Sequence, residues 1–188
     1  MPSAAYTNSL DALLNDAEEL LQAHGKSKTG KAGRQWGLGG LNRACVVMCV
    51  SAWEAYVESL IRESLSKMRP AATSNIVWPI LTHPAERELG RFHTPNPDQV
   101  RFLFSTCIGL DDVTVNWYWQ KCSQKQAVQY LKDILKLRHE IAHGVNPRPS
   151  VDFGYAEWLL PFFRRLGEKT DATVKDYLVT TLGLPSPW

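Results

Sequence analysis

Apolar residues recur at three- and four-residue steps along most of the chain, which is the period of an amphipathic helix. Residues 9–24, SLDALLNDAEELLQAH, show this spacing in their leucines and alanines. The same period runs through residues 41–68 and again through residues 123–143. A last helical region is predicted over about residues 151–182, with a bend at Pro161. Most of the chain is therefore predicted to be helical.

The middle of the chain interrupts this pattern. Residues 70–97 contain five prolines, and we predict no helix there. At its end Asn96 can cap a helix that starts at Pro97 and stops at Gly109. No run alternates with a period of two, so strands are at most minor. We expect an all-α, up-and-down four-helix bundle with a proline-rich mid-chain excursion and extra short helices.

Length and composition are those of an ordinary soluble globular protein. The 188 residues are 44% hydrophobic and 21% charged, which predicts one domain spanning residues 1–188. The formal net charge is only +2, which excludes a generically basic nucleic-acid binder and leaves local patches as the possible contacts.

The N-terminus and the cysteines bear on where the protein is found in the cell. The N-terminal residues carry acids where a signal peptide needs cations, and we expect no segment to reach the roughly 18 apolar residues of a membrane span. We therefore expect a cytoplasmic protein without a membrane anchor. The four cysteines show no C-x2-C pair, and Cys45 and Cys49 are expected to be small core fillers.

The stretch LRHEIAHG, residues 137–144, carries the candidate chemistry and has two interpretations. His139-Glu140-x-x-His143 matches the zinc-binding helix of metalloproteases. Arg138 followed by His143 matches a motif of helical RNA-cleaving domains. Neither pattern is specific by itself, because Arg87 and His93 form a second Arg–His match at a permitted spacing.

Helical geometry places Arg138 in the middle of the apolar stripe of residues 123–143. A core-facing guanidinium needs an acceptor, because burying it alone costs several kcal/mol. Glu54 lies inside the apolar arc of the preceding long helix and is the candidate acceptor. We predict that Arg138 and Glu54 are neighbours, which also allows a purely structural ion pair.

The same geometry disfavours the zinc interpretation. His139 and His143 share a helix face with Lys132 and Lys136, and ammonium groups are poor neighbours for a divalent cation. A zinc protease also needs a third ligand, and no histidine follows His143 at the required spacing, so that only Glu157 or Glu168 remains as a possibility. Zinc hydrolysis is retained as a remote alternative.

Several stretches together resemble one family. LNRACVVMCVSAWEAYVESLIRE, TPNPDQVRFLFSTCIGLDDVTVNWYW, LKLRHEIAHG and RRLGEKTDATVKDYLVTTLG resemble, in order and spacing, the RiboL-PSP-HEPN branch of the HEPN superfamily. The resemblance implies a bundle of four main helices, usually dimeric, in proteins known or predicted to be metal-independent ribonucleases of toxin–antitoxin and antiviral defence systems. The family motif is an Arg, a polar residue, and a His four to six residues after the Arg.

Carried over to this chain, the motif assigns catalytic positions to Arg138, His139 and His143. Glu54, which helical geometry places opposite Arg138, is a further candidate residue of the site. His139 stands where Asn or Asp is more frequent in the family. The implied reaction is attack of an RNA 2′-hydroxyl on the adjacent phosphodiester of single-stranded RNA, which leaves a 2′,3′-cyclic phosphate. No cofactor or metal is expected. A homodimer with a composite active site and an antitoxin or defence partner are the implied partners.

Residues 25–40 form a glycine-rich loop with four cations that could hold RNA phosphates, although solvated charge is the default interpretation. These candidate RNA-binding residues are Lys26, Lys28, Lys31 and Arg34. A second hypothesis is a non-catalytic HEPN bundle that acts as an interaction or RNA-binding module. It would be supported if Arg138 and Glu54 form only a structural pair.

Overall fold

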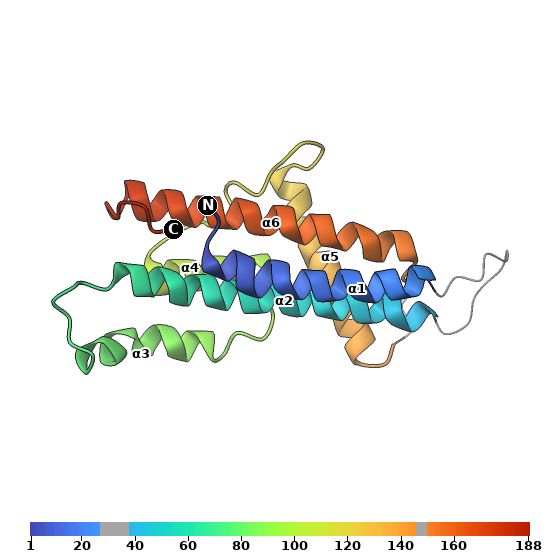
Figure 1. Cartoon of the computed structure of the whole chain (residues 1–188), viewed down its shortest axis with the longest axis horizontal. Helices are drawn as coiled ribbons and strands as arrows, with labels where there is room; N and C mark the ends of the chain where they lie inside the picture. Colours follow the sequence, from blue (N-terminus) through green and yellow to red (C-terminus); the bar gives the residue numbers. More distant parts are fainter. Residues whose placement is uncertain (27–37, 146–149) are drawn as a thin grey trace.

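A computed structural model describes residues 1–26, 38–145 and 150–188 of the chain. The helices follow one another without an intervening sheet in the described residues (Figure 1). In chain order they are the π-helical η1 (Tyr6–Asp11), α1 (Ala12–Lys26), α2 (Leu38–Met68), α3 (Val77–Leu89), α4 (Pro97–Ile108), α5 (Gln124–Ala142) and α6 (Phe153–Thr180).

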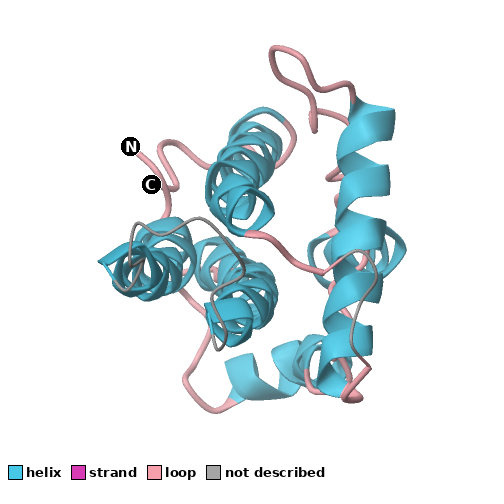
Figure 2. Ribbon diagram, turned by 90° about the vertical axis from the view of Figure 1, so that its right-hand side faces the viewer, coloured by secondary structure: helices cyan, strands magenta, loops and turns pink. Residues whose placement is uncertain are grey.

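The long helices form a bundle in which one member crosses the others. Helices α1, α2 and α6 lie side by side along the long axis of the molecule, and α2 and α6 run in the same direction (Figure 1). Helix α5 crosses them steeply, as the end-on view shows (Figure 2). The all-α bundle is thus confirmed, but its fourth long helix does not run alongside the other three in a simple up-and-down arrangement.

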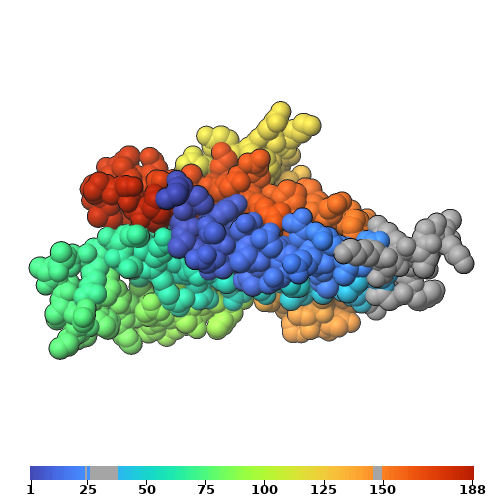
Figure 3. Space-filling view, viewed as in Figure 1, coloured from blue at the N-terminus to red at the C-terminus, as the bar shows by residue number. Residues whose placement is uncertain are grey.

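Helix α2 occupies the centre and has buried side chains along most of its length. It packs against η1, α1, α4, α5 and α6, and α1 covers part of it on the face shown in Figure 3. Trp53, Tyr56 and Leu60 are completely buried, and so are Cys45 and Cys49, which confirms the two cysteines as core fillers.

The length and hydropathy of α2 correct one expectation. Contrary to the sequence prediction, this helix is long and apolar enough to cross a membrane by those two criteria alone. In the structure more than half of its most apolar window is buried against other parts of the chain. The burial accounts for its hydropathy, because a helix that is hydrophobic all round is typical of a protein core as well as of a membrane.

The predicted ends of α4 and α5 are confirmed. The Asn96 side chain accepts hydrogen bonds from the first backbone N–H groups of α4, and Gly109 ends that helix with a φ of 79°. Ser123 caps α5 through a reciprocal capping box with Gln126. Helix α6 continues through Pro161.

The prediction of no helix in residues 70–97 is wrong, because α3 lies within it. Pro79 falls in the first turn of α3, where a missing backbone N–H breaks no helical hydrogen bond. Pro84 lies inside the helix but on its exposed side. The carbonyl that it leaves without a helical partner belongs to Ile80, whose residue is 68% exposed, so water can satisfy it.

Candidate active site on α5 and α2

The LRHEIAHG stretch lies at the C-terminal end of α5, which projects beyond α2 (Figures 1 and 3). Earlier in the helix, Ala127, Leu131, Ile134 and Leu135 are buried. Helix α5 packs against α2, and Arg138 lies one turn after Ile134 on the same side of the helix. The apolar contacts of α5 therefore carry the Arg138 side chain towards α2.

Arg138 meets Glu54 there. The Nη2 atom of Arg138 is 3.9 Å from the Oε2 atom of Glu54, and the side chains are 31% and 21% exposed. The predicted proximity of these two residues is confirmed. The expectation that Arg138 is sequestered below the surface is wrong: it is half-buried, because α5 crosses α2 and its last turns extend past it.

The Glu54 carboxyl sits in an unusual electrostatic position. Burial raises its pKa above the ordinary value, the positive charge of Arg138 acts in the opposite direction, and Glu58 adds to the increase. Since the pKa remains raised, the desolvation of Glu54 outweighs the attraction that it gains from Arg138. The pKa of Glu54 is thus raised although a guanidinium lies 3.9 Å away.

His93 is a further neighbour of the Arg138–Glu54 pair. Its charge lowers the pKa of Glu54, although it lies in the connection between α3 and α4. The Trp53 indole N–H donates to the Pro95 carbonyl at 3.1 Å and ties this connection to α2 beside Glu54. The Arg87–His93 match was the available signal, but α3 ends before His93, so the two residues form no helical motif.

The two histidines of the motif lie next to each other. The ring centroids of His139 and His143 are 4.2 Å apart, as expected for residues four apart on a helix. His143 is the C-cap of α5, and its backbone N–H bonds to the His139 carbonyl at 3.1 Å. Both side chains are exposed. The two imidazoles predicted to share one face of the helix therefore lie side by side at its end.

This imidazole pair has no set of metal ligands around it in the described part of the chain. No group of three or more His, Cys, Asp and Glu residues that could hold a metal ion occurs among those residues. A zinc site of the metalloprotease type needs three protein ligands. The described residues therefore offer the remote zinc alternative two imidazoles and no third ligand.

The predicted RNA-contacting residues are only partly described. Lys26 is the last residue of α1, and Lys28, Lys31 and Arg34 lie outside the described residues, so the role of this loop stays a prediction. Of the aromatic residues after α4, Trp117 is fully buried and donates its indole N–H to Thr170.

Comparison with known proteins identifies the family. The family model described as RiboL-PSP-HEPN matches residues 9–176, which include every helix of the candidate site. Searches of curated proteins and of solved structures find no match. Since the family model spans most of the sequence, the chain belongs to the RiboL-PSP-HEPN family.

Proposed function

We propose that this protein is a metal-independent endoribonuclease that cleaves single-stranded RNA. The observation that carries the proposal is a half-buried Arg138, held at the surface by Glu54, at the same helix end as two exposed and adjacent imidazoles. A guanidinium can grip a phosphate through two N–H donors and stabilise the extra negative charge that develops on it. Imidazoles exchange protons near neutral pH.

In the proposed reaction the RNA 2′-oxygen forms a bond to phosphorus and the bond from phosphorus to the 5′-oxygen breaks. One imidazole accepts the 2′-hydroxyl proton, and an imidazolium donates a proton to the departing 5′-oxygen. The products are a 2′,3′-cyclic phosphate and a 5′-hydroxyl. His143 and His139 can share these two tasks, or His143 of a second copy can supply one of them across a two-fold interface.

The proposal includes the setting in which such an enzyme works. We place it in the cytoplasm as a homodimer with a composite active site, and we expect an antitoxin or defence partner to restrain it. The family to which the chain belongs supports this setting.

The test is cleavage of single-stranded RNA by the purified chain in EDTA. Arg138→Ala and His143→Ala should each reduce cleavage by at least about a hundred-fold. Arg87→Ala and His83→Ala are matched controls, because both residues are exposed on α3. They should leave the rate unchanged, and circular dichroism should show the same helix content in all four variants. Equal losses in the α5 and α3 variants, or activity restored only by zinc, would refute the proposal.

A non-catalytic interaction module is the second candidate. Two observations favour it: Arg138 already has an anionic partner in Glu54, and α3 presents apolar residues to solvent. Ile80 and Leu81 are 68% and 60% exposed, and exposed apolar patches are typical of protein contact sites. Absence of RNA cleavage at high protein concentration, with an intact fold, would favour this function.

A further inference from the structure

One face of α5 carries a line of cationic and imidazole side chains, and its lysines have no role in the proposed reaction. At about 100° per residue, these positions fall within an arc of roughly 60°, which begins about 40° beyond the buried Leu135. All five side chains are exposed. They are Lys125, Lys132, Lys136, His139 and His143, which we call the α5 stripe.

The acidic neighbours of the α5 stripe are few and lie at its borders. Lys132 pairs with Asp98 of α4 at 3.1 Å, and Asp98 is itself 61% exposed. Asp133 and Glu140 lie further round the helix, on the side away from Arg138. Among the described residues, no carboxylate forms an ion pair with the other two lysines of the stripe. The stripe therefore keeps a net positive charge that faces solvent.

The spacing of the stripe suits a nucleic-acid backbone. Lys132 and Lys136 are four residues apart, and so are His139 and His143; each step covers about 6 Å along the axis, close to the spacing of successive phosphates in an extended single strand. Lys125 lies seven residues before Lys132, about 11 Å away. From Lys125 to His143 the stripe is about 27 Å long, enough for roughly four or five phosphates. It ends at the imidazole pair, where the proposed chemistry takes place.

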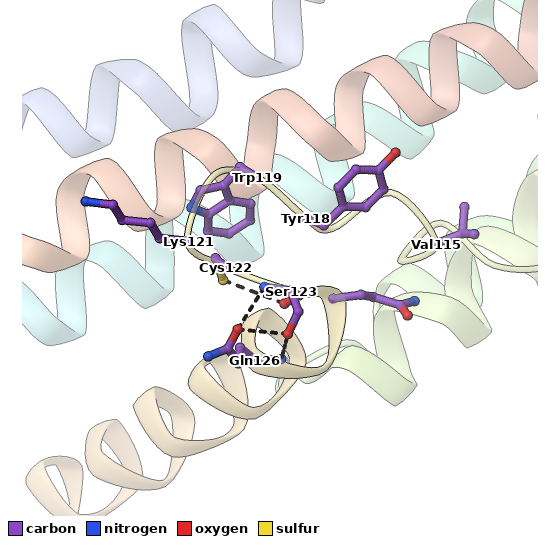
Figure 4. A pocket seen from close by; sticks show the side chains of 8 residues that line it. Val115, Tyr118, Trp119, Lys121, Cys122, Ser123 and Gln126 are labelled. Carbon is purple, nitrogen blue, oxygen red and sulfur yellow. Dashed lines mark hydrogen bonds between the residues drawn. The ribbon is translucent and has the colours of Figure 1, made fainter.

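A hollow lies at the opposite end of α5, where the helix begins (Figure 4). Its volume is about 690 Å³, and it is lined by Tyr118, Lys121 and Gln124, among other residues. Tyr118 is 54% exposed, with the Lys169 ammonium 5.3 Å from its ring centroid. Exposed aromatic rings beside cations are the platforms on which unpaired bases stack.

We propose that the α5 stripe binds the backbone of single-stranded RNA and leads it from a base stacked on Tyr118 to the imidazole pair. The inference rests on the proposed function, whose substrate path it specifies. An acidic protein would also be attracted to lysines, but it needs neither the phosphate-like distance between Lys132 and Lys136 nor the aromatic ring at the end of the stripe. RNA is therefore the ligand to which the observations point.

Binding is measured with a fluorescein-labelled, 2′-O-methylated oligouridylate of about 12 nucleotides, a length that spans the stripe. The methyl group blocks the 2′-hydroxyl nucleophile, so the probe reports binding without cleavage. Fluorescence anisotropy of the full chain is followed between about 50 and 200 mM salt. Lys136→Glu is compared with Lys67→Glu, since both lysines are exposed on helices and both substitutions change the net charge equally.

Lys136→Glu should weaken binding about ten-fold and lower the slope of log affinity against log salt by about 0.7, the value for one lost single-strand phosphate contact. Lys67→Glu should remain within about two-fold of the natural chain. Tyr118→Ala should weaken binding by at least about five-fold. Circular dichroism confirms that each variant is folded.

Equal weakening by Lys136→Glu and Lys67→Glu, or no weakening by either, would overturn the inference and leave an acidic protein as the ligand to test on this face. An effect of Lys136→Glu without one of Tyr118→Ala would overturn the path to the hollow. The proposed function and this inference can fail separately. If the chain binds RNA along α5 but never cuts it, the nuclease function is refuted and the α5 stripe remains an RNA-binding surface. If Lys136→Glu changes neither binding nor cutting of RNA that the chain does cut, the stripe is refuted and the nuclease function remains.

Discussion

The Arg138–Glu54 pair allows a quantitative test of how the site is held. With 3.9 Å between the charged atoms, the Coulomb attraction is about 1 kcal/mol at the dielectric constant of water and about 4 kcal/mol at an effective value near 20. Both side chains are partly exposed, so solvent and the cost of desolvation reduce the net value. We expect a coupling free energy of about 1 kcal/mol.

The raised pKa of Glu54 predicts that the two partners contribute unequally. Desolvation already costs the ionised carboxylate more than Arg138 returns. Glu54→Gln removes that cost together with the attraction, and should change the free energy of unfolding by no more than about 0.5 kcal/mol. Arg138→Gln leaves the carboxylate desolvated without its cation, and should lower the free energy of unfolding by about 1 kcal/mol near pH 7.

The raised pKa of Glu54 also determines how the free energy of unfolding changes with pH. Because the folded-state pKa of Glu54 is raised, the native state binds more protons than the unfolded state between the two pKa values. Stability from this group therefore falls as pH rises through that window. Arg138→Gln raises the pKa further, so its destabilisation should shrink when the pH is lowered to about 4.5.

The assay is urea unfolding of the natural chain, the two single variants and the double variant, followed by circular dichroism at both pH values. The double variant should be about as stable as Glu54→Gln alone, because it no longer contains a desolvated carboxylate that loses its cation when Arg138 is replaced. Losses that simply add in the double variant, or a larger loss for Glu54→Gln than for Arg138→Gln, would contradict this account of the pair.

Three further predictions concern the fold that supports the site. Gly167→Ala places a methyl group against Leu10, which is fully buried, and should destabilise the chain by about 1–3 kcal/mol in urea unfolding. Asn96→Ala removes the acceptor for two backbone N–H groups of α4 and should cost about 1 kcal/mol in the same assay, whereas Asn96→Asp should retain most of the stability. Asp171 has a pKa raised mainly by burial, so the natural chain should lose stability, relative to Asp171→Asn, as pH rises through that pKa; parallel pH profiles for the two chains would show that this carboxyl is not desolvated.

Particular residues show how far sequence reasoning reached into the site. The wheel positions of Arg138 and Glu54 predicted that they meet, because both charges lie in apolar stripes that two packed helices bury against each other. The depth of Arg138 was predicted wrongly. The exposure of Arg138 depends on where α5 crosses α2 and on how far its last turns extend beyond that crossing. The spacing of apolar residues in the sequence does not encode the position or angle of the crossing.

His93 and α3 illustrate a different limit. Prolines in residues 70–97 predicted irregular structure, yet α3 forms because one proline occupies its first turn and the other faces solvent. His93 lies near Glu54 because a hydrogen bond from Trp53 to Pro95 ties the following connection to α2. Such contacts join residues about 40 positions apart in the chain, and no local pattern marks them.

The sequence by itself determined the helical class, the caps at Asn96 and Ser123, the stop at Gly109 and the pairing of His139 with His143, because each depends on atoms within a turn or two of the chain. Only the tertiary structure decided that α5 crosses the bundle, that its last turns stand clear of α2, and that Arg138 is therefore half-exposed beside Glu54. Those features follow from the packing of side chains contributed by distant segments, whose angles and depths local periodicity does not encode.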